Sequence, residues 1–316
     1  MKKVKDLSKK KLSKKDLYQL TELIFVLFIF ALVVNYRTEI HSFIIDNVLY
    51  HKEAYISNSN EYAKEYSFEF VKISDEYIAT NKQQILDIFY TYLNNGEDSF
   101  YFYCDYDDCI RDVNILTNQG YFASINNFVH PYNTYNRLYI TSNSWGKIEV
   151  NIAKTYRDDE INEINKKINS IIKEIIKDDM SDKEKIRAFH DYVINNSKYD
   201  IDYINRNLKI LEHPSHKASG TLLYSKSLCG GYSHTMALFL DILKIPNYRI
   251  SSDTHIWNYV YLDGNWYHLD LTWDDPVTSN NVDVLLHKYF LISSDKLESF
   301  NTGVHSYDKN IFIEAN

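Results

Sequence analysis

The stretch SLCGGYSHTM, residues 227–236, contains a cysteine followed by two glycines and the start of an apolar run. A thiol attacks a carbonyl carbon only as the thiolate, which the free N–H groups and the dipole of a helix N-terminus favour. The apolar residues from Met236 onward recur at helical spacing until Pro246, which predicts a helix just after Cys229. Cys229 is therefore a candidate nucleophile, and the ordinary alternative is a buried structural cysteine.

The two glycines after Cys229 leave its backbone uncrowded. We expect Gly230 and Gly231 to give a substrate carbonyl room to approach the thiol, with the N–H group of Cys229 as an oxyanion donor. Gly230 is accordingly a candidate substrate-binding residue.

A nucleophilic thiol needs a base, and the base needs a group that orients it. Residues 254–276 read THIWNYVYLDGNWYHLDLTWDDP, two β-rich aromatic runs around Asp263-Gly264, which is a strong hairpin signal. A two-residue turn pairs Leu262 with Asn265. The second strand is then expected to continue beyond residue 270.

In this register His255, Trp257, Asp270 and Thr272 share one face of the hairpin. His255 and Asp270 are diagonal neighbours, and Cβ atoms in such a pair lie about 7–8 Å apart, within reach of an imidazole and a carboxylate. A three-residue loop would instead move Asp270 to the opposite face. His268 is a rival base on the same face, and a structural histidine with a turn-capping aspartate is the ordinary alternative.

The other histidines and cysteines give weaker signals. His213, His216 and His234 lack the paired spacing of a zinc site, so no metal or other cofactor is expected. Cys104 and Cys109 bracket the sequence DYDD and could close a small disulfide loop outside the cell, which leaves Cys229 as the odd thiol. An acidic metal loop is the alternative for this segment.

The N-terminus is basic and then strongly apolar. Residues 1–22 hold eight Lys against three acidic residues, so the net charge of −8 for the chain leaves −13 on the remainder. An acidic body argues against a nucleic-acid partner. We expect a cytoplasmic tail over residues 1–16 and an uncleaved signal anchor over 17–36, with the body of the chain extracytoplasmic. A cleaved signal peptide and a buried N-terminal helix are the alternatives.

The remaining 280 residues are expected to form two parts. Residues 37–156 read as a small α+β region, with a helix from an N-cap at Ser74, a strand over 99–104 and a hairpin over 137–156. Residues 157–316 form the second part, which opens on an isoleucine-rich helix.

The next helix of this second part begins with a recognisable signal. Ser181 and Glu184 have the spacing of a capping box, in which each side chain accepts from the backbone of the other residue. A helix is therefore expected directly after Ser181.

At these residues the sequence resembles the transglutaminase-like superfamily, over about residues 157–300. The motifs that carry the resemblance are MSDKEKIRAFHDYVINNSKYD, SLCGGYSHTMALFLDILKIP and HIWNYVYLDGNWYHLDLTWDDP. It implies a papain-like α+β fold with a helix-borne cysteine packed on an antiparallel sheet. It also implies Cys229 as nucleophile, His255 as base and acid, and Asp270 as the orienting residue.

The resemblance further implies acyl transfer or hydrolysis on peptide or protein amides through a thioester, without a cofactor. An additional side chain is expected to complete the oxyanion hole, and Tyr199 and Tyr224 are candidates. Trp257 is a further candidate for substrate binding. Peptidase, amidase and cross-linking transferase stay open. The alternative from another class is a non-catalytic surface module that binds protein or cell-wall peptide.

Overall fold

The computed structural model describes residues 13–44, 60–118, 124–143, 145–206, 212–278 and 284–312. The chain divides into two units, residues 1–55 and residues 56–316, and each is described by itself.

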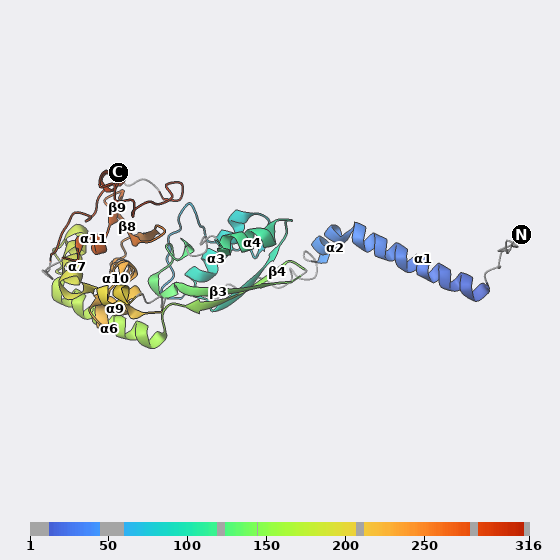
Figure 1. Cartoon of the computed structure of the whole chain (residues 1–316), viewed down its shortest axis with the longest axis horizontal. Coiled ribbons are helices and arrows are strands. Elements are labelled where there is room, and N and C mark those ends of the chain that lie inside the picture. Colours follow the sequence, from blue (N-terminus) through green and yellow to red (C-terminus); the bar gives the residue numbers. More distant parts are fainter. Residues whose placement is uncertain are drawn as a thin grey trace, which may run out of the picture. The chain divides into compact units, whose positions relative to one another are not determined.

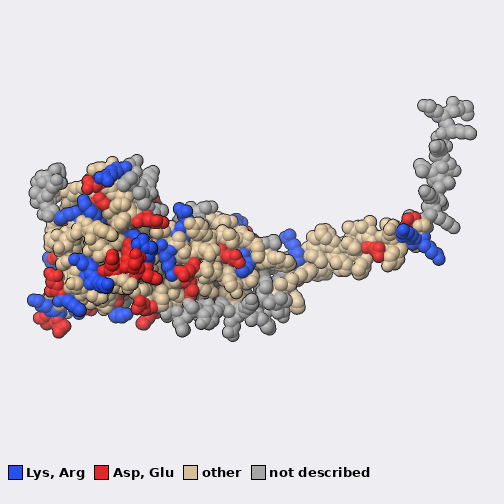
Figure 2. Space-filling view, turned by 90° about the horizontal axis from the view of Figure 1, so that it is seen from below, with Lys and Arg blue, Asp and Glu red and all other residues tan. Residues whose placement is uncertain are grey.

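The N-terminal unit contains α1 (Lys14–Asn35) and α2 (Arg37–Ile44). Ser13 caps α1 in a capping box with Asp16. By length and composition α1 can cross a membrane: its best window has a mean hydropathy of 2.3 and no buried residue, although a signal sequence near the N-terminus has the same properties. Figure 2 shows its mostly uncharged surface, with Lys and Arg at one end.

Residues 60–156 supply a four-stranded sheet in the order β1-β2-β4-β3, which is antiparallel except for the β1–β2 pair. The elements of this part are β1 (Ile78–Ala79), α3 (Lys82–Asn94), β2 (Ser99–Cys104), α4 (Cys109–Asn118), η2 (Pro131–Asn133), β3 (Tyr135–Ser142) and β4 (Lys147–Lys154). The predicted strand over 99–104 and the following hairpin are thereby confirmed.

The helix expected from Ser74 begins later. Its N-cap is Asn81, whose side chain accepts from the N–H of Gln84. The residues just before it, Ile78–Ala79, pair with β2 instead, and the side chain of Ser74 accepts from the N–H of Glu76 outside any helix. The first part of the predicted helix is therefore extended, because it pairs with the sheet.

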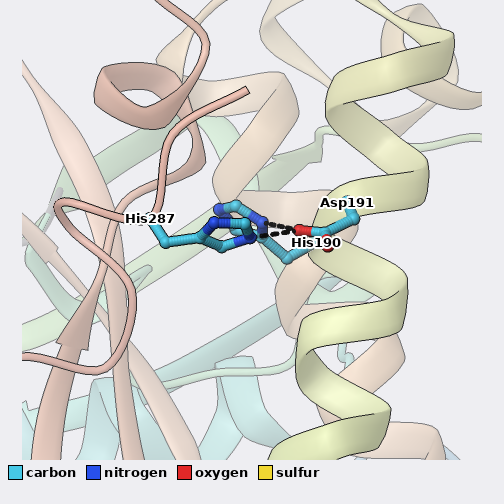
Figure 3. A group of neighbouring side chains, drawn as sticks. All are labelled: His190, Asp191 and His287. Atoms are coloured by element: carbon cyan, nitrogen blue, oxygen red, sulfur yellow. Dashed lines mark hydrogen bonds and ion pairs between the residues drawn. The ribbon is translucent and has the colours of Figure 1, made fainter. Parts of the chain in front are cut away.

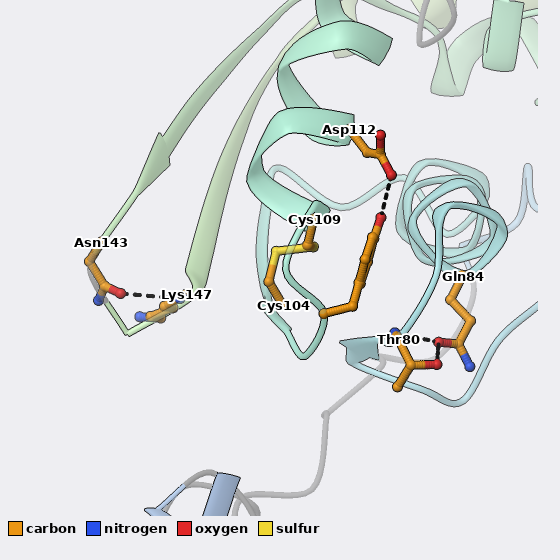
Figure 4. Close-up of a disulfide and its surroundings, with 8 residues drawn as sticks. Thr80, Gln84, Cys104, Cys109, Asp112, Asn143 and Lys147 are labelled. Carbon is orange, nitrogen blue, oxygen red and sulfur yellow. Dashed lines mark hydrogen bonds between the residues drawn. A yellow bond between two sulfur atoms is a disulfide. The ribbon is translucent and has the colours of Figure 1, made fainter. Parts of the chain in front are cut away.

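Cys104 and Cys109 form a disulfide between the end of β2 and the start of α4 (Figure 4). Inside the loop, the hydroxyl of Tyr106 donates to Asp112 at 2.9 Å. The disulfide that the sequence analysis expected for these two cysteines is thus present.

The C-terminal part packs helices against a second, antiparallel sheet in the order β7-β8-β9. Figure 1 shows α6, α7, α9 and α10 gathered at this end of the unit, away from α3 and α4. The elements are α6 (Asp158–Ile175), α7 (Asp182–Asn196), β5 (Lys198–Tyr199), α8 (Ile201–Asn205), η3 (Pro214–His216), α9 (Ala218–Leu223), β6 (Lys226–Ser227), α10 (Cys229–Ile242), β7 (Asn247–Ser251), β8 (Ile256–Leu262), β9 (Asn265–Leu269), α11 (Leu271–Asp274) and α12 (Ser294–Ser299). The capping box predicted before α7 is present at Ser181.

The β8–β9 hairpin has the predicted register, with Leu262 opposite Asn265. Asp263 and Gly264 have φ values of 52° and 85°, the left-handed backbone that a two-residue hairpin turn requires. The second strand is shorter than expected, however. It ends at Leu269 because the chain turns into α11, so Thr272 is helical rather than paired with His255.

Alternate residues of β8 face two different cores. Trp257 and Tyr259 pack in a cluster with residues of α3, β2 and β4, whereas Val260 and Leu262 pack with the helices α6, α7, α9 and α10. The boundary that the sequence analysis expected between residues 37–156 and residues 157–316 therefore falls inside one compact unit. An ion pair also connects these two parts, since the ammonium group of Lys64 lies 3.2 Å from Asp241.

Candidate active site

Cys229 is the first residue of α10, and it is half-buried with a free thiol. The preceding residue, Leu228, occupies the N-cap position and has no side-chain acceptor, so the first N–H groups of the helix stay available for an anion. The backbone N–H of Leu228 donates to the carbonyl of Ser215 at 2.7 Å, which fixes the chain just before the thiol.

The two glycines after Cys229 are needed for packing. A Cβ atom on Gly230 would lie 2.6 Å from the carbonyl oxygen of His216, and one on Gly231 would lie 2.6 Å from that of Ser215. Their small size therefore lets α10 pack against η3. The expectation that they also make room for a substrate backbone stays a prediction.

Two hydrogen bonds hold α10 against the elements that carry the other candidate residues. The side-chain amide of Asn258 on β8 donates to the carbonyl of Ser233 at 2.9 Å. The hydroxyl of Tyr232 donates to Asp275, just after α11, at 2.5 Å. The start of α10 is thus fixed relative to both β8 and α11.

Asp270 is buried at the junction between β9 and α11. One carboxylate oxygen, Oδ1, accepts from the N–H groups of Thr272 and Trp273 and so caps α11. The other oxygen, Oδ2, lies 2.7 Å from Nε2 of His255. Burial alone would raise the pKa of Asp270, but the charge and hydrogen bond of His255 outweigh it and hold that pKa well below its usual range.

His255 precedes β8, is hydrogen-bonded to Asp270, and lies near the thiol of Cys229. Burial disfavours its charged form, but the charge and hydrogen bond of Asp270, followed by the hydrogen bond and charge of Cys229, raise the pKa of His255 to about 10. Because Nε2 faces Asp270, the nitrogen left for the thiol is Nδ1. The structure thus brings together the three residues singled out as nucleophile, base and orienting group.

A fourth member, His305, was missed from the sequence. Its Nε2 atom lies 2.8 Å from the same oxygen of Asp270 that His255 contacts, and its Nδ1 atom lies 2.9 Å from the hydroxyl of Thr302. It lies in a stretch without helical or strand periodicity, beyond the segment that resembles the superfamily. No local sequence signal marks it. Cys229, His255, Asp270 and His305 are called the thiol cluster below.

His268, the rival base, is occupied elsewhere. Its Nδ1 atom accepts from the indole N–H of Trp257 at 3.0 Å, and its Nε2 atom lies 3.1 Å from the hydroxyl of Ser294. Burial lowers the pKa of His268 to about 3, so the ring is neutral and structural. Trp257 stacks on His255 with ring centres 5.7 Å apart, and its N–H is directed to His268 rather than towards the thiol.

The two tyrosine candidates lie in different surroundings. Tyr199 on β5 pairs with Ser227, two residues before the thiol. Burial, followed by the charges of Cys229 and Asp270, raises its pKa, so its ring is near both groups. Tyr224 is 62% exposed and has Arg157 as a charged neighbour. Of the two tyrosines, Tyr199 is therefore the one whose surroundings include the thiol.

The remaining histidine candidates stay apart from the thiol. His234 lies on α10 and its Nδ1 atom is 2.8 Å from the hydroxyl of Tyr156. His213 and His216 flank η3 and pack their rings against Tyr203. These contacts account for all three as structural residues.

One segment of the chain matches a known family, and two known proteins are similar to part of the chain. Residues 169–271 match the model of the Transglutaminase-like superfamily, which confirms the predicted resemblance for this segment. The kyphoscoliosis peptidase of Mus musculus is 24% identical over 144 residues, which is 39% of this chain and 21% of the mouse protein. The chain thus matches about a fifth of that relative. A solved structure described as the crystal structure of a TGase is 17% identical, with a TM-score of 0.32 over 47% of this chain and 48% of that one.

Proposed function

We propose that this chain, whose residues 169–271 belong to the transglutaminase-like superfamily, catalyses thiol-dependent acyl transfer or hydrolysis on peptide or protein amides. The observation that supports the proposal is the position of His255, which is hydrogen-bonded to the buried carboxylate of Asp270 and lies close enough to Cys229 for the thiol to raise its pKa. A thiol, an imidazole and a carboxylate in this order are the groups that nucleophilic catalysis requires.

The first half of the reaction forms a thioester. The thiolate sulfur of Cys229 attacks the amide carbonyl carbon, and the carbonyl electrons move to the oxygen. When the tetrahedral intermediate collapses, the C–N bond breaks and the His255 imidazolium donates its proton to the leaving nitrogen. The products of this half-reaction are a free amine or ammonia and an acyl group on Cys229.

The second half regenerates the thiol. Neutral His255 accepts a proton from water or from a second amine, which attacks the thioester carbon. The C–S bond breaks, and the sulfur leaves as the thiolate paired with the imidazolium. Water gives a carboxylic acid and therefore hydrolysis, whereas an amine gives a new amide and therefore transfer.

Two donors are available for the oxyanion. We assign the backbone N–H of Cys229, at the start of α10, and the hydroxyl of Tyr199, whose ring is near the thiol. Removing one such donor commonly costs about 10²–10³ in kcat. Tyr199→Phe should therefore lower kcat more than it raises KM.

His305 is assigned a positioning role. It contacts Asp270 at the oxygen that also holds His255, and its second nitrogen is held by Thr302. This arrangement restrains the carboxylate and hence the orientation of His255. His305 does not touch the thiol in any contact that the described residues show.

We further propose that α1 anchors the protein in a membrane, with the Lys-rich N-terminus cytoplasmic and the compact unit outside. The disulfide between Cys104 and Cys109 supports an oxidising location for the compact unit. Protease accessibility of that unit on intact cells tests this orientation, and protection of the unit would contradict it.

The reaction is tested by incubating the full-length chain with a glutamine-containing protein and a labelled primary amine. Amine incorporation indicates a transferase, ammonia release without incorporation indicates a deamidase, and chain cleavage indicates a peptidase. Each product must disappear in Cys229→Ala. No product, together with an unreactive thiol, would overturn the enzyme proposal in favour of a binding module.

A further inference from the structure

A second group of residues outside the thiol cluster has the composition of a metal site. His190, Asp191 and His287 are called the open cluster, and their possible ligand atoms lie within 4.8 Å of one another. His190 and Asp191 come from α7, and His287 comes from the segment before α12, about a hundred residues later. Figure 3 shows both imidazole rings directed at the carboxylate of Asp191.

The three side chains converge on one point. Nδ1 of His190 lies 2.8 Å from Oδ1 of Asp191, and Nε2 of His287 lies 2.6 Å from the same oxygen. Two nitrogens and one carboxylate oxygen therefore face one another from two separate segments. This is the donor set of many three-ligand metal centres.

A second carboxylate, that of Asp274, contacts His190 on the side away from Asp191. The outer nitrogen of His190, Nε2, lies 3.2 Å from Oδ2 of Asp274, and both side chains are fully buried. A histidine that donates its outer N–H to a carboxylate presents its other nitrogen unprotonated to a metal ion. Asp274 thus favours the form of His190 that binds through Nδ1, and the protons that His190 and His287 donate to Asp191 are released to solvent when the ion binds.

We propose that the open cluster binds one zinc ion, or a similar first-row divalent cation, through His190 Nδ1, His287 Nε2 and an oxygen of Asp191. Imidazole nitrogens favour zinc and its neighbours over calcium and magnesium, which take oxygen ligands. Asp191 and His287 are 33% and 26% exposed at their side chains, which gives an ion an entry path and leaves a position for water.

Binding requires a small local adjustment. Ligand atoms around tetrahedral zinc are about 3.3 Å apart, so the present contacts must open by a few tenths of an ångström. Arg187 lies 3.3 Å from Nδ1 of His287, the nitrogen that carries the proton when Nε2 binds the ion. Its side chain is exposed on α7 and can turn away into solvent.

The ion would join α7 to the segment that supports Asp270. Two residues after His287, the N–H of Tyr289 donates to Asp274 and its carbonyl accepts from the N–H of Asp270. An ion in the open cluster would therefore stabilise the packing around α11 without touching the thiol. The inference does not depend on the proposed function.

The test measures bound metal and thermal stability on the full-length chain in detergent, purified with a tag that contains no histidine. After loading with zinc and desalting, mass spectrometry should find about one zinc per chain. Zinc should raise the Tm by a few degrees over the EDTA-treated protein. Calcium and magnesium at the same concentration should not.

Variants locate the site and separate it from the thiol. His287→Ala and Asp191→Asn should lose the zinc and the Tm shift, and neither removes the fully buried His190. His213→Ala, a matched histidine deletion elsewhere, and Cys229→Ser should keep both. Zinc retained by His287→Ala, zinc lost in Cys229→Ser, or no zinc on the wild type would each overturn the proposal.

Discussion

Two clusters in the compact unit contain two histidines and one aspartate, and in each one both rings contact a single carboxylate oxygen. In the thiol cluster His255 and His305 contact Asp270, and in the open cluster His190 and His287 contact Asp191. The residue types alone would assign both clusters the same chemistry.

The surroundings separate them. In the thiol cluster the side chains of His255, Asp270 and His305 are buried, and the half-buried thiol of Cys229 at a helix N-terminus lies near His255. The open cluster has no thiol among its described neighbours, is partly exposed, and has a second carboxylate behind His190. The thiol favours nucleophilic chemistry, whereas exposure with a second carboxylate favours an ion. The chemistry that we assign to each cluster thus depends more on the groups beside the histidines than on the histidines themselves.

The largest difference between the clusters should appear in activity. Cys229→Ala removes the nucleophile and should lower kcat by about 10³-fold or more, and His255→Ala should do nearly the same because the two groups act as a unit. His287→Ala should leave kcat within about twofold of wild type. Steady-state kinetics with the amide substrate measures all three. Equal losses of kcat in His255→Ala and His287→Ala would contradict the different roles assigned to the two clusters.

Asp270→Asn should change the pH dependence. The carboxylate raises the pKa of His255 to about 10, so the wild type keeps its acidic imidazolium, and its kcat/KM, up to that region. Without the carboxylate, the imidazolium is lost at lower pH, and the alkaline limb should move towards the ordinary value of about 6.5. A pH profile of kcat/KM measures the shift, and an unmoved limb would contradict the assigned role of Asp270.

His305 should have a smaller effect. His305→Phe keeps an aromatic ring but removes the contact with Asp270, and kcat should fall about tenfold with a lowered alkaline limb. His305→Gln retains a donor and should recover part of both. Loss of folding stability without any shift in the limb would show that the residue is only structural.

The smallest expected effect is the influence of the open cluster on the thiol. Zinc removal by EDTA should lower the Tm by a few degrees while kcat at 25 °C stays within about twofold, because the ion lies outside the reacting groups. Parallel melting and rate measurements on one sample test this. A loss of activity that follows zinc removal at constant fold would contradict the separation of the two clusters.

Short-range patterns predicted much of the fold and the site. Asp263-Gly264 fixed the register of the β8–β9 hairpin because both residues accept positive φ, and this register placed Asp270 near His255. The capping box at Ser181 could be predicted because both of its hydrogen bonds join residues three positions apart. The helix after Cys229 followed from apolar spacing.

The features that the sequence analysis did not predict share a physical cause. The backbone of η3 approaches Gly230 closely, a contact between segments that no spacing rule contains. His305 and His287 each meet their aspartate only through tertiary packing, from segments without periodicity. The late start of α3 reflects strand pairing of Ile78 with Tyr103, which local capping rules do not include.

The central claim is that His255 activates the thiol of Cys229 as a nucleophile. The most direct measurement is the rate of iodoacetamide labelling of the full-length chain at pH 5.5, with the labelled residue mapped by mass spectrometry. We predict labelling of Cys229 about a hundredfold faster than that of a free thiol, which is almost fully protonated at this pH, and loss of this advantage in His255→Ala. Labelling at the free-thiol rate, unchanged in His255→Ala, would contradict the account.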